Sequence, residues 1–299
     1  MEQKRHTFKE WMVAVRPWSF PASAMPVVAT LGYLFAFHQA VNWVNGIWAL
    51  LNIIVFHAAG NTWSDYFDYR KKVDAEDTFG VRTLTSGMFT CKEIMILSIS
   101  LLAVAVAGGI MLWLRTGMPL LHIGLAGAAC SLLYPFLKYH SLGDFVIFAA
   151  YAFLPTLGTA YAASLTVDWH VLYIAVPVGL ITVAILHANN TRDIRTDDRA
   201  HITTIAMNMG AKASVWLYCF EVLFPFFWIS GCVIVGVLPV WCLLSWIVVV
   251  PALMNSRIAV SYFKQGADAI AGLDEATAKL QLVFSLVLTL SFILAGLFS

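Results

Sequence analysis

Runs of apolar residues long enough to cross a lipid bilayer dominate this sequence. A membrane-spanning helix needs roughly 20 predominantly apolar residues. Such runs lie at residues 17–37, 44–64, 94–114, 117–137, 145–165, 171–191, 213–235, 238–254 and 280–298. Only 12% of the 299 residues are charged, about half the share found in soluble domains. This composition excludes a soluble globular enzyme, a disordered chain and a nucleic-acid binder, and we expect an all-α integral membrane protein with about nine transmembrane helices.

The basic residues indicate how the chain is oriented in the membrane. Short loops rich in Lys and Arg stay in the cytoplasm. If the nine spans cross the membrane in alternating directions, seventeen of the eighteen Lys and Arg residues lie on the same side of the membrane as the N-terminus, and only Arg115 does not. We therefore expect a multi-pass protein of the inner (plasma) membrane, with its N-terminus in the cytoplasm and its C-terminus on the opposite side. The sequence contains no evident repeat or linker, so residues 1–299 are expected to form a single domain.

A cluster of acidic residues follows the second expected span, on the expected cytoplasmic face. The segment reads Asn61-Thr-Trp-Ser-Asp65-Tyr-Phe-Asp68, and two more acids follow at Asp74 and Asp77. Residues three and four apart share a face of a helix. Asn61, Asp65 and Asp68 are therefore expected to form one polar stripe, which we call the first acidic motif.

A second acidic cluster leaves the sixth expected span on the same face. It reads Asn189-Asn190-Thr-Arg192-Asp193-Ile-Arg-Thr-Asp197-Asp198. The spacing of four residues places Asn189, Asp193 and Asp197 on one stripe, with Arg192 beside it. This second acidic motif, like the first, has an amide about one helical turn deeper in the membrane than its carboxylates.

Two such stripes at one membrane depth favour a shared polar site. Carboxylates near hydrocarbon usually face a wet cavity or a partner, and several in one pocket repel each other unless cations lie between them. Mg²⁺ prefers oxygen ligands and is often held by carboxylates together with substrate phosphates. One interpretation is therefore a diphosphate bridged by Mg²⁺. The other is that each cluster simply solvates the end of a helix.

The motifs resemble those of the UbiA superfamily of intramembrane aromatic prenyltransferases. The resemblance covers nearly the whole chain and includes the opening Trp11-Met-Val-Ala-Val-Arg16-Pro17, both acidic motifs, and Leu142-Gly143-Asp144. The long gap between Asp68 and Asp74 is similar to the branch that prenylates 1,4-dihydroxy-2-naphthoate.

The sequence departs from the family pattern at a few positions. Ser64 stands where the family usually has Asn, and Ile202, beside His201, stands where a Lys is frequent. Arg82-Thr-Leu-Thr-Ser-Gly87 is closer to other members of the superfamily than to the naphthoate branch.

The resemblance implies a bundle of nine helices around a central cavity that opens to the cytoplasmic side and laterally to lipid. It implies transfer of a polyprenyl group from polyprenyl diphosphate to 1,4-dihydroxy-2-naphthoate, with loss of CO₂ and diphosphate, giving demethylmenaquinone. The expected partners are this donor, the aromatic acceptor and the lipid bilayer, and the expected cofactor is a pair of Mg²⁺ ions. Two alternatives stay open: the same chemistry on 4-hydroxybenzoate or haem, and a membrane transporter that binds a cation.

The same resemblance assigns roles to the polar residues. The expected catalytic and metal-binding carboxylates are Asp65, Asp68, Asp193 and Asp197. Further metal ligands are expected at Asp74, Asn61 and Asn189. The diphosphate is expected to contact Asn61, Asn189, Arg192, Arg82 and Arg16. Supporting roles are expected for Asp77, Asp144, Asn190, Asp198 and His201.

Overall fold

The computed structural model describes residues 5–38, 40–73 and 83–298. These residues form helices and no β-strand. The α-helices are α1 (Phe8–Val15), α2 (Pro21–Phe37), α3 (Trp43–Arg70), α4 (Cys91–Thr116), α5 (Met118–Lys138), α6 (Gly143–Phe148), α7 (Leu154–Ser164), α8 (Leu172–Arg192), α9 (Ile194–Arg199), α10 (Ile205–Ile234), α11 (Val249–Gln265) and α12 (Leu273–Phe298). A π-helical segment (Ala149–Phe153) joins α6 to α7, so that these two helices form one continuous span.

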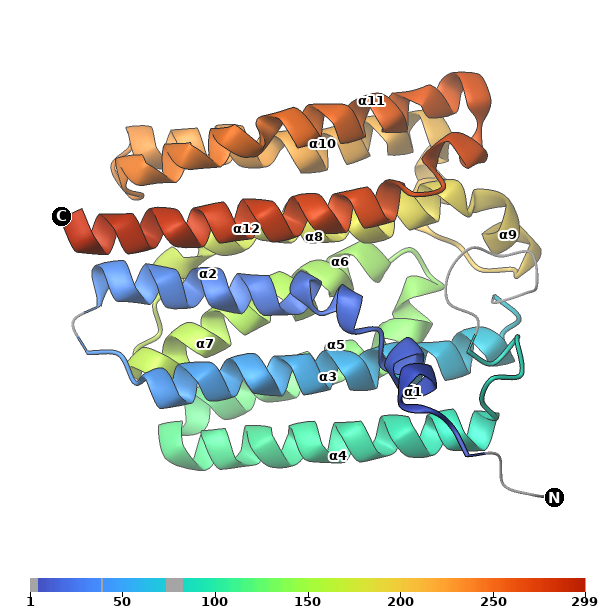
Figure 1. Cartoon of the computed structure of the whole chain (residues 1–299), viewed down its shortest axis with the longest axis horizontal. Helices are drawn as coiled ribbons and strands as arrows, with labels where there is room; N and C mark the ends of the chain where they lie inside the picture. The colour runs from blue at the N-terminus through green and yellow to red at the C-terminus, as the bar shows by residue number, and fades with distance from the viewer. Residues whose placement is uncertain (1–4, 39, 74–82, 299) are drawn as a thin grey trace.

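Eight helices among the described residues are long and apolar enough to cross a membrane, and the bent N-terminal pair brings the number to nine. The long helices run along one common axis (Figure 1). This arrangement confirms the expected all-α, multi-pass membrane architecture.

The first expected span, residues 17–37, is preceded by a sharp bend. The segments Phe8–Ser19 and Pro21–Phe37 meet at 50°. Arg16 ends α1 in the left-handed conformation, with φ of 55°, and Pro17 and Pro21 lack the N–H group that a continuous helix needs. The bend lays α1 across the end of the bundle, where it packs against α3 (Figure 1).

Helix α3 extends beyond its apolar region. The sequence predicts a span that ends near residue 64, whereas α3 remains helical to Arg70. Hydropathy marks only the part of a helix that lies in hydrocarbon, and the polar residues of the first acidic motif continue the same hydrogen-bonded ladder. Asp65 and Asp68 therefore lie on its last turns, at the end of the bundle.

Helix α8 forms the centre of the bundle. Its apolar stretch is 67% buried, against 6% for that of α5. It packs against α10 and α12, and α12 packs in turn against α2. In this core Phe226 and Phe284 are fully buried and meet edge to face, with their ring centroids 5.5 Å apart. Helices α4 and α5 instead expose apolar side chains such as Leu114 and Leu125, as expected for lipid-facing helices.

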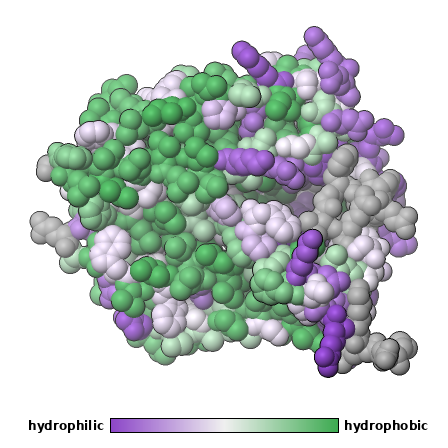
Figure 2. Space-filling model, in the orientation of Figure 1, coloured by the Kyte–Doolittle hydropathy of each residue, from purple (hydrophilic) through white to green (hydrophobic). Residues whose placement is uncertain are grey.

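Polar side chains gather at the ends of the bundle. In Figure 2 they concentrate at the end that holds α1, α9 and the N-terminus, while apolar side chains cover the middle. The C-terminus lies at the opposite end (Figure 1). We call the end with α1 and α9 the acidic end, because both acidic motifs lie there.

Asp168 links α2 to the start of α8 at the opposite end of the bundle. Asp168, which precedes α8, accepts hydrogen bonds from Tyr33 Oη on α2 (3.0 Å) and from the backbone N–H of His170 (2.9 Å). His38 Nε2 lies 3.0 Å from the same carboxylate. Burial raises the pKa of Asp168, but the hydrogen bonds from His38, His170 and Tyr33 together lower it below its ordinary value.

The lowered pKa of Asp168 predicts a pH-dependent contribution to stability. Asp168→Asn is expected to lower the thermal midpoint at pH 7, since the ionised carboxylate holds α2 to the start of α8. A carboxyl with a depressed folded-state pKa stabilises above its unfolded value, near about pH 4, and loses this effect as pH falls through the folded value. Thermal unfolding in detergent, followed by circular dichroism, should show the two proteins converging at low pH. A difference that persists there would contradict the assignment.

Candidate functional site

Asp65, the first carboxylate of the site, is buried at the acidic end of α3. It is only 3% exposed. It forms an ion pair with the guanidinium of Arg16, at the bend after α1. Thr83 Oγ1, which precedes α4, donates a hydrogen bond of 3.0 Å to its other oxygen. The N-terminal segment and the segment before α4 therefore both close over Asp65.

Asp68, three residues further along α3, has a different set of partners. Lys138 Nζ lies 2.7 Å from Asp68 Oδ2, and Tyr139 Oη donates a hydrogen bond of 2.8 Å to Oδ1. Both residues come from the end of α5. Ser64 Oγ donates a third hydrogen bond, of 3.0 Å, within α3 itself. Each carboxylate of the first acidic motif is thus paired with one basic side chain from another part of the chain.

The second acidic motif lies where the central helix breaks. Asp193 is the residue between α8 and α9, and Arg192 donates two hydrogen bonds of 2.8 Å to its two carboxylate oxygens. Arg192 also lies 3.4 Å from the carboxylate of Asp274, on the first turn of α12. The guanidinium therefore connects the end of α8 to α12.

The two motifs are close enough to interact electrostatically. Asp197 on α9 is 7% exposed. Burial and the negative charges of Asp193 and Asp68 raise the pKa of Asp197 to about 7, although the positive charges of Lys138 and Arg192 oppose this. The charges of Asp68, from the first motif, and of its partner Lys138 therefore both affect the pKa of Asp197. The acidic end holds one crowded cluster of carboxylates and not two separate helix ends.

Backbone pairing holds the two motifs in register. The N–H of Thr203, just after α9, donates to the carbonyl of Tyr139 at 3.0 Å, and the N–H of Ser141 donates to the carbonyl of Thr203 at 2.8 Å. The turn that presents Lys138 and Tyr139 is therefore attached directly to the segment that follows Asp197.

The amides of the two motifs point to different surroundings. Asn61 donates to the carbonyl of Val15 (3.0 Å) and to Ser19 Oγ (3.1 Å), so it fixes the N-terminal bend over α3. Asn189 Oδ1 is buried with no hydrogen-bond partner among the described residues. Asn190 Nδ2 lies 3.3 Å from Asp144 Oδ1.

The remaining expected site residues that the structure describes form no side-chain hydrogen bond or ion pair with the four expected metal-binding carboxylates. Asp144, at the start of α6, is buried and turns toward His187 on α8, with 2.9 Å between Asp144 Oδ2 and His187 Nδ1. Asp198 and His201 are exposed. Three further expectations, Asp74, Asp77 and Arg82, lie outside the described residues.

Sequence reasoning did not assign Lys138, Tyr139 and Thr83 to the site. The signal for the first two was present, because Lys138 is the basic residue between the fourth and fifth expected spans, and Tyr139 follows it. Thr83 lies in the segment Arg82-Thr-Leu-Thr-Ser-Gly87 that resembles the superfamily, but nothing in that segment indicates a contact with Asp65.

The cluster fits Mg²⁺. All of its acceptors are oxygens of carboxylates and amides, the donor set that Mg²⁺ prefers. Burial and the negative charges of Asp193 and Asp68 raise the pKa of Asp197, and a cation between the motifs would offset these charges. Asn189 Oδ1, which is buried without a hydrogen-bond partner among the described residues, offers a further oxygen one helical turn before Asp193. Asp65, Asp68, Asp193 and Asp197, with Asn189, are the side chains that would hold the ion.

The fold and this polar cluster are those of an integral membrane protein with a buried, charged site at one end of its helical bundle. The model of the UbiA prenyltransferase family matches residues 24–271, and the chain belongs to this family. It is therefore a UbiA-family prenyltransferase.

Curated relatives include proteins of more than one kind. A UbiA prenyltransferase domain-containing protein 1 homolog of Drosophila melanogaster is 31% identical over 233 residues, covering 75% of this chain and 65% of its own length. A 1,4-dihydroxy-2-naphthoate octaprenyltransferase of Mycobacterium tuberculosis is 31% identical over 217 residues, covering 71% of this chain and 74% of its own. The human UbiA prenyltransferase domain-containing protein 1 is 28% identical over 299 residues, covering 97% of this chain and 85% of its own.

Solved structures show the same fold. A UbiA homolog from Archaeoglobus fulgidus bound to GPP and Mg²⁺ superposes with a TM-score of 0.66 at 12% identity, covering 94% of this chain and 99% of its own. The apo structure of a UbiA homolog from Aeropyrum pernix gives 0.64 at 17% identity, covering 92% and 97%.

Removing one carboxylate from each motif tests the site. Asp65→Asn and Asp193→Asn are each expected to lower prenyl transfer by roughly 100-fold or more, because each removes charge that binds cations near the reacting group. Turnover of the purified protein in detergent gives the activity, and circular dichroism checks the fold. Asp268→Asn, at an exposed residue between α11 and α12, makes the same chemical change and should keep wild-type activity. Full activity in both motif variants would refute the role of these acids.

Proposed function

We propose that this protein transfers a polyprenyl group from polyprenyl diphosphate to 1,4-dihydroxy-2-naphthoate, giving demethylmenaquinol, the hydroquinone form of demethylmenaquinone. The observation that carries the proposal is the cluster at the acidic end, where Asp65, Asp68 and Asp197 alternate with Arg16 and Lys138. Such a mixture of carboxylates and cations suits a diphosphate that arrives with Mg²⁺. The M. tuberculosis naphthoate octaprenyltransferase among the relatives supports this acceptor.

The basic residues have two successive tasks in this proposal. Without substrate, Arg16 and Lys138 neutralise Asp65 and Asp68. The four carboxylates would hold two Mg²⁺ ions, and Arg16, Lys138 and Arg192 would then donate hydrogen bonds to diphosphate oxygens. When bound, Mg²⁺ stabilises the negative charge that develops on the leaving diphosphate. The residues of the cluster thereby hold the leaving group and orient the allylic carbon toward the acceptor.

The proposed reaction balances with diphosphate and CO₂ as products. The bond between the allylic carbon and the diphosphate oxygen breaks, and the diphosphate leaves with the electron pair. A new bond forms between the allylic carbon and the ring carbon that bears the carboxylate. Loss of that carboxylate as CO₂ returns its electron pair to the ring and restores aromaticity. Burial within the bundle keeps water from the allylic cation.

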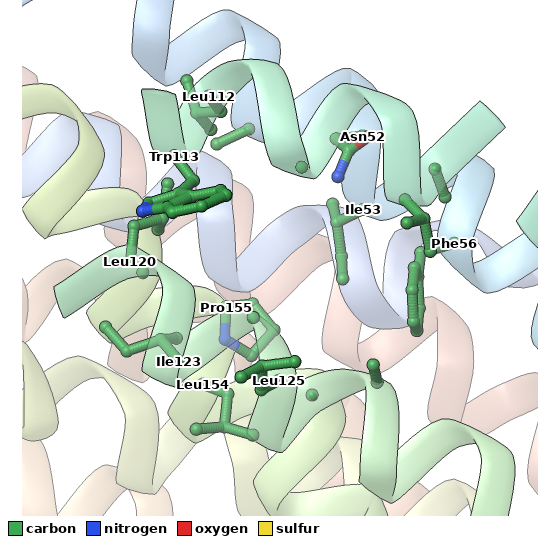
Figure 3. Close-up of a pocket in the computed structure, with 18 of the residues that line it drawn as sticks. Asn52, Ile53, Phe56, Leu112, Trp113, Leu120, Ile123, Leu125, Leu154 and Pro155 are labelled. Carbon is green, nitrogen blue, oxygen red and sulfur yellow. The ribbon is translucent and has the colours of Figure 1, made fainter. Parts of the chain in front are cut away.

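An apolar pocket beside α3 is suited to the distal part of the prenyl chain. The pocket has a volume of about 260 Å³, and its lining includes Asn52, Ile53 and Phe56 of α3 and Trp113 of α4. Figure 3 shows side chains from α3, α4, α5 and α7 surrounding this space. At about 1.5 Å per residue, Phe56 lies roughly 13 Å along α3 from Asp65. A smaller hollow lined by Phe56, Gly60 and Trp63 extends toward the acids.

The orientation follows from the same proposal. Diphosphate is an anion of the cytosol, so the acidic end faces the cytoplasm, in agreement with the distribution of basic residues. The N-terminus then lies in the cytoplasm and the C-terminus on the other side of the inner (plasma) membrane. The prenyl chain and the product stay in contact with lipid throughout.

A product assay distinguishes the acceptors. Purified protein with Mg²⁺ and a polyprenyl diphosphate is expected to convert 1,4-dihydroxy-2-naphthoate into a prenylated product that has lost the carboxyl group as CO₂. Mass spectrometry identifies this product. Omitting Mg²⁺ should abolish the product, since the leaving diphosphate then lacks its countercharge. Product from 4-hydroxybenzoate or haem alone would replace the naphthoate assignment. Absence of product from all three acceptors would overturn the proposal.

Filling the apolar pocket tests its role as the chain site. Gly127 lines the pocket on α5, and a Cβ added there meets open space. Gly127→Phe is expected to lower kcat/KM for a long polyprenyl diphosphate by about 10-fold relative to geranyl diphosphate, because the ring occupies space that distal isoprene units need.

The matched control is Gly231→Phe on α10. This glycine is exposed, lies outside the pocket, and its Cβ position is also open. It should leave the ratio between long and short donors unchanged. Equal losses for both donors in Gly127→Phe would contradict the proposed chain site.

A further inference from the structure

Three buried side chains meet between α6, α8 and α10, apart from the carboxylates assigned to Mg²⁺. They are Asp144, His187 and Glu221, which are 7%, 0% and 4% exposed. One ligand atom from each lies within 4.8 Å of the other two. His187 Nδ1 is 2.9 Å from Asp144 Oδ2 and 3.9 Å from Glu221 Oε1. We call these residues the buried triad.

The second ring nitrogen of His187 already has partners. His187 Nε2 lies 3.1 Å from the carbonyl oxygen of Ser214 and 2.8 Å from Ser214 Oγ. A carbonyl only accepts, so Nε2 carries the proton in this arrangement. Nδ1 forms a hydrogen bond of 2.9 Å with Asp144 Oδ2, and a bound ion would take the place of the proton shared between these two atoms. Histidines that bind metals characteristically donate their other N–H to a carbonyl or carboxylate in this way.

Glu221 supplies an independent sign of a missing ligand. Its Oε2 atom is buried and has no hydrogen-bond partner among the described residues. A buried carboxylate oxygen without a partner is costly. This oxygen is available as a further ligand on an ion held between Nδ1 and the carboxylates.

The distances suit a small tetrahedral ion. Zinc bonds to histidine nitrogen and carboxylate oxygen measure about 2.0–2.2 Å, which places tetrahedral ligand atoms roughly 3.4 Å apart. The two distances from His187 Nδ1, 2.9 and 3.9 Å, lie on either side of this value. The site therefore closes on an ion when Asp144 moves away from His187, and Glu221 toward it, by about 0.5 Å each.

We propose that Asp144, His187 and Glu221 bind a divalent transition-metal ion, with Zn²⁺ as the ion that best matches this donor set. Two carboxylates balance its double charge, so the site is neutral inside the bundle. The ion joins α6, α8 and α10, and Asn190 contacts it indirectly through Asp144 (3.3 Å). It is a structural site beneath the second acidic motif, separate from the cluster that binds diphosphate.

Metal analysis of the full-length protein tests this proposal without any measurement of prenyl transfer. The protein is purified in detergent without a metal-affinity column, incubated with Zn²⁺, passed into metal-free buffer and analysed by plasma mass spectrometry. One zinc ion per chain is expected, with loss of most of it in Glu221→Gln and Asp144→Asn. Circular dichroism establishes that the variants remain folded. Zinc-free wild-type protein, or undiminished zinc in a folded Glu221→Gln variant, would overturn the proposal.

Two further variants locate the ion. Asp193→Asn alters the diphosphate cluster and should keep its zinc, and so should Asp268→Asn. Zinc that disappears in Asp193→Asn while persisting in Glu221→Gln would place the ion in the other cluster and refute the triad.

Cobalt provides a second readout if the Glu221→Gln variant does not fold. Co²⁺ added to the metal-free wild-type protein is expected to produce visible d–d bands of a four-coordinate site, and Zn²⁺ should displace them. Absence of these bands would refute the site. Because neither readout involves a prenyl donor or an acceptor, failure here leaves the proposed reaction to be judged by its own assay.

Discussion

The neutralisation of buried carboxylates is the constraint on which the acidic end of this protein depends. Asp65, Asp68 and Asp197 are each less than a tenth exposed, at a depth where an unpaired charge is costly. Arg16 reaches Asp65 from the N-terminal bend, and Lys138 reaches Asp68 from the end of α5. The acids therefore determine how the surrounding segments fold over them. In the proposed function, the same acids exchange these partners for Mg²⁺.

The basic partners of these acids come from several connecting segments that meet at one end of the bundle. Arg16 stands at a left-handed turn directly before Pro17, which positions its side chain without a long connecting helix. Arg192 lies beside the carboxylate that it contacts and also reaches the start of α12. The hydrophobic bundle supplies the support for these groups, because its central helix α8 ends at Asp193, among the charges.

The fold could be anticipated from the sequence to a large extent, and the site only in part. Apolar runs about 20 residues long are stable in a membrane as helices, so the membrane-spanning helices could be predicted from the sequence. Helical spacing likewise placed Asp65 and Asp68 on one face. The bend at Arg16 depends on backbone conformation, and the contact of Lys138 with Asp68 joins residues 70 positions apart. Such contacts arise from packing, which no local pattern encodes. The direction of Asp144, toward His187, has the same origin.

The backbone pairing between Thr203 and the turn at Tyr139 and Ser141 has a mechanical consequence. Those hydrogen bonds tie the segment after α9 to the turn before α6, so neither segment can move without the other. A residue inserted into or deleted from either segment would therefore displace the ammonium group of Lys138, which lies at the start of the turn before α6. We therefore expect insertions or deletions to be tolerated in these two segments only when both change length together.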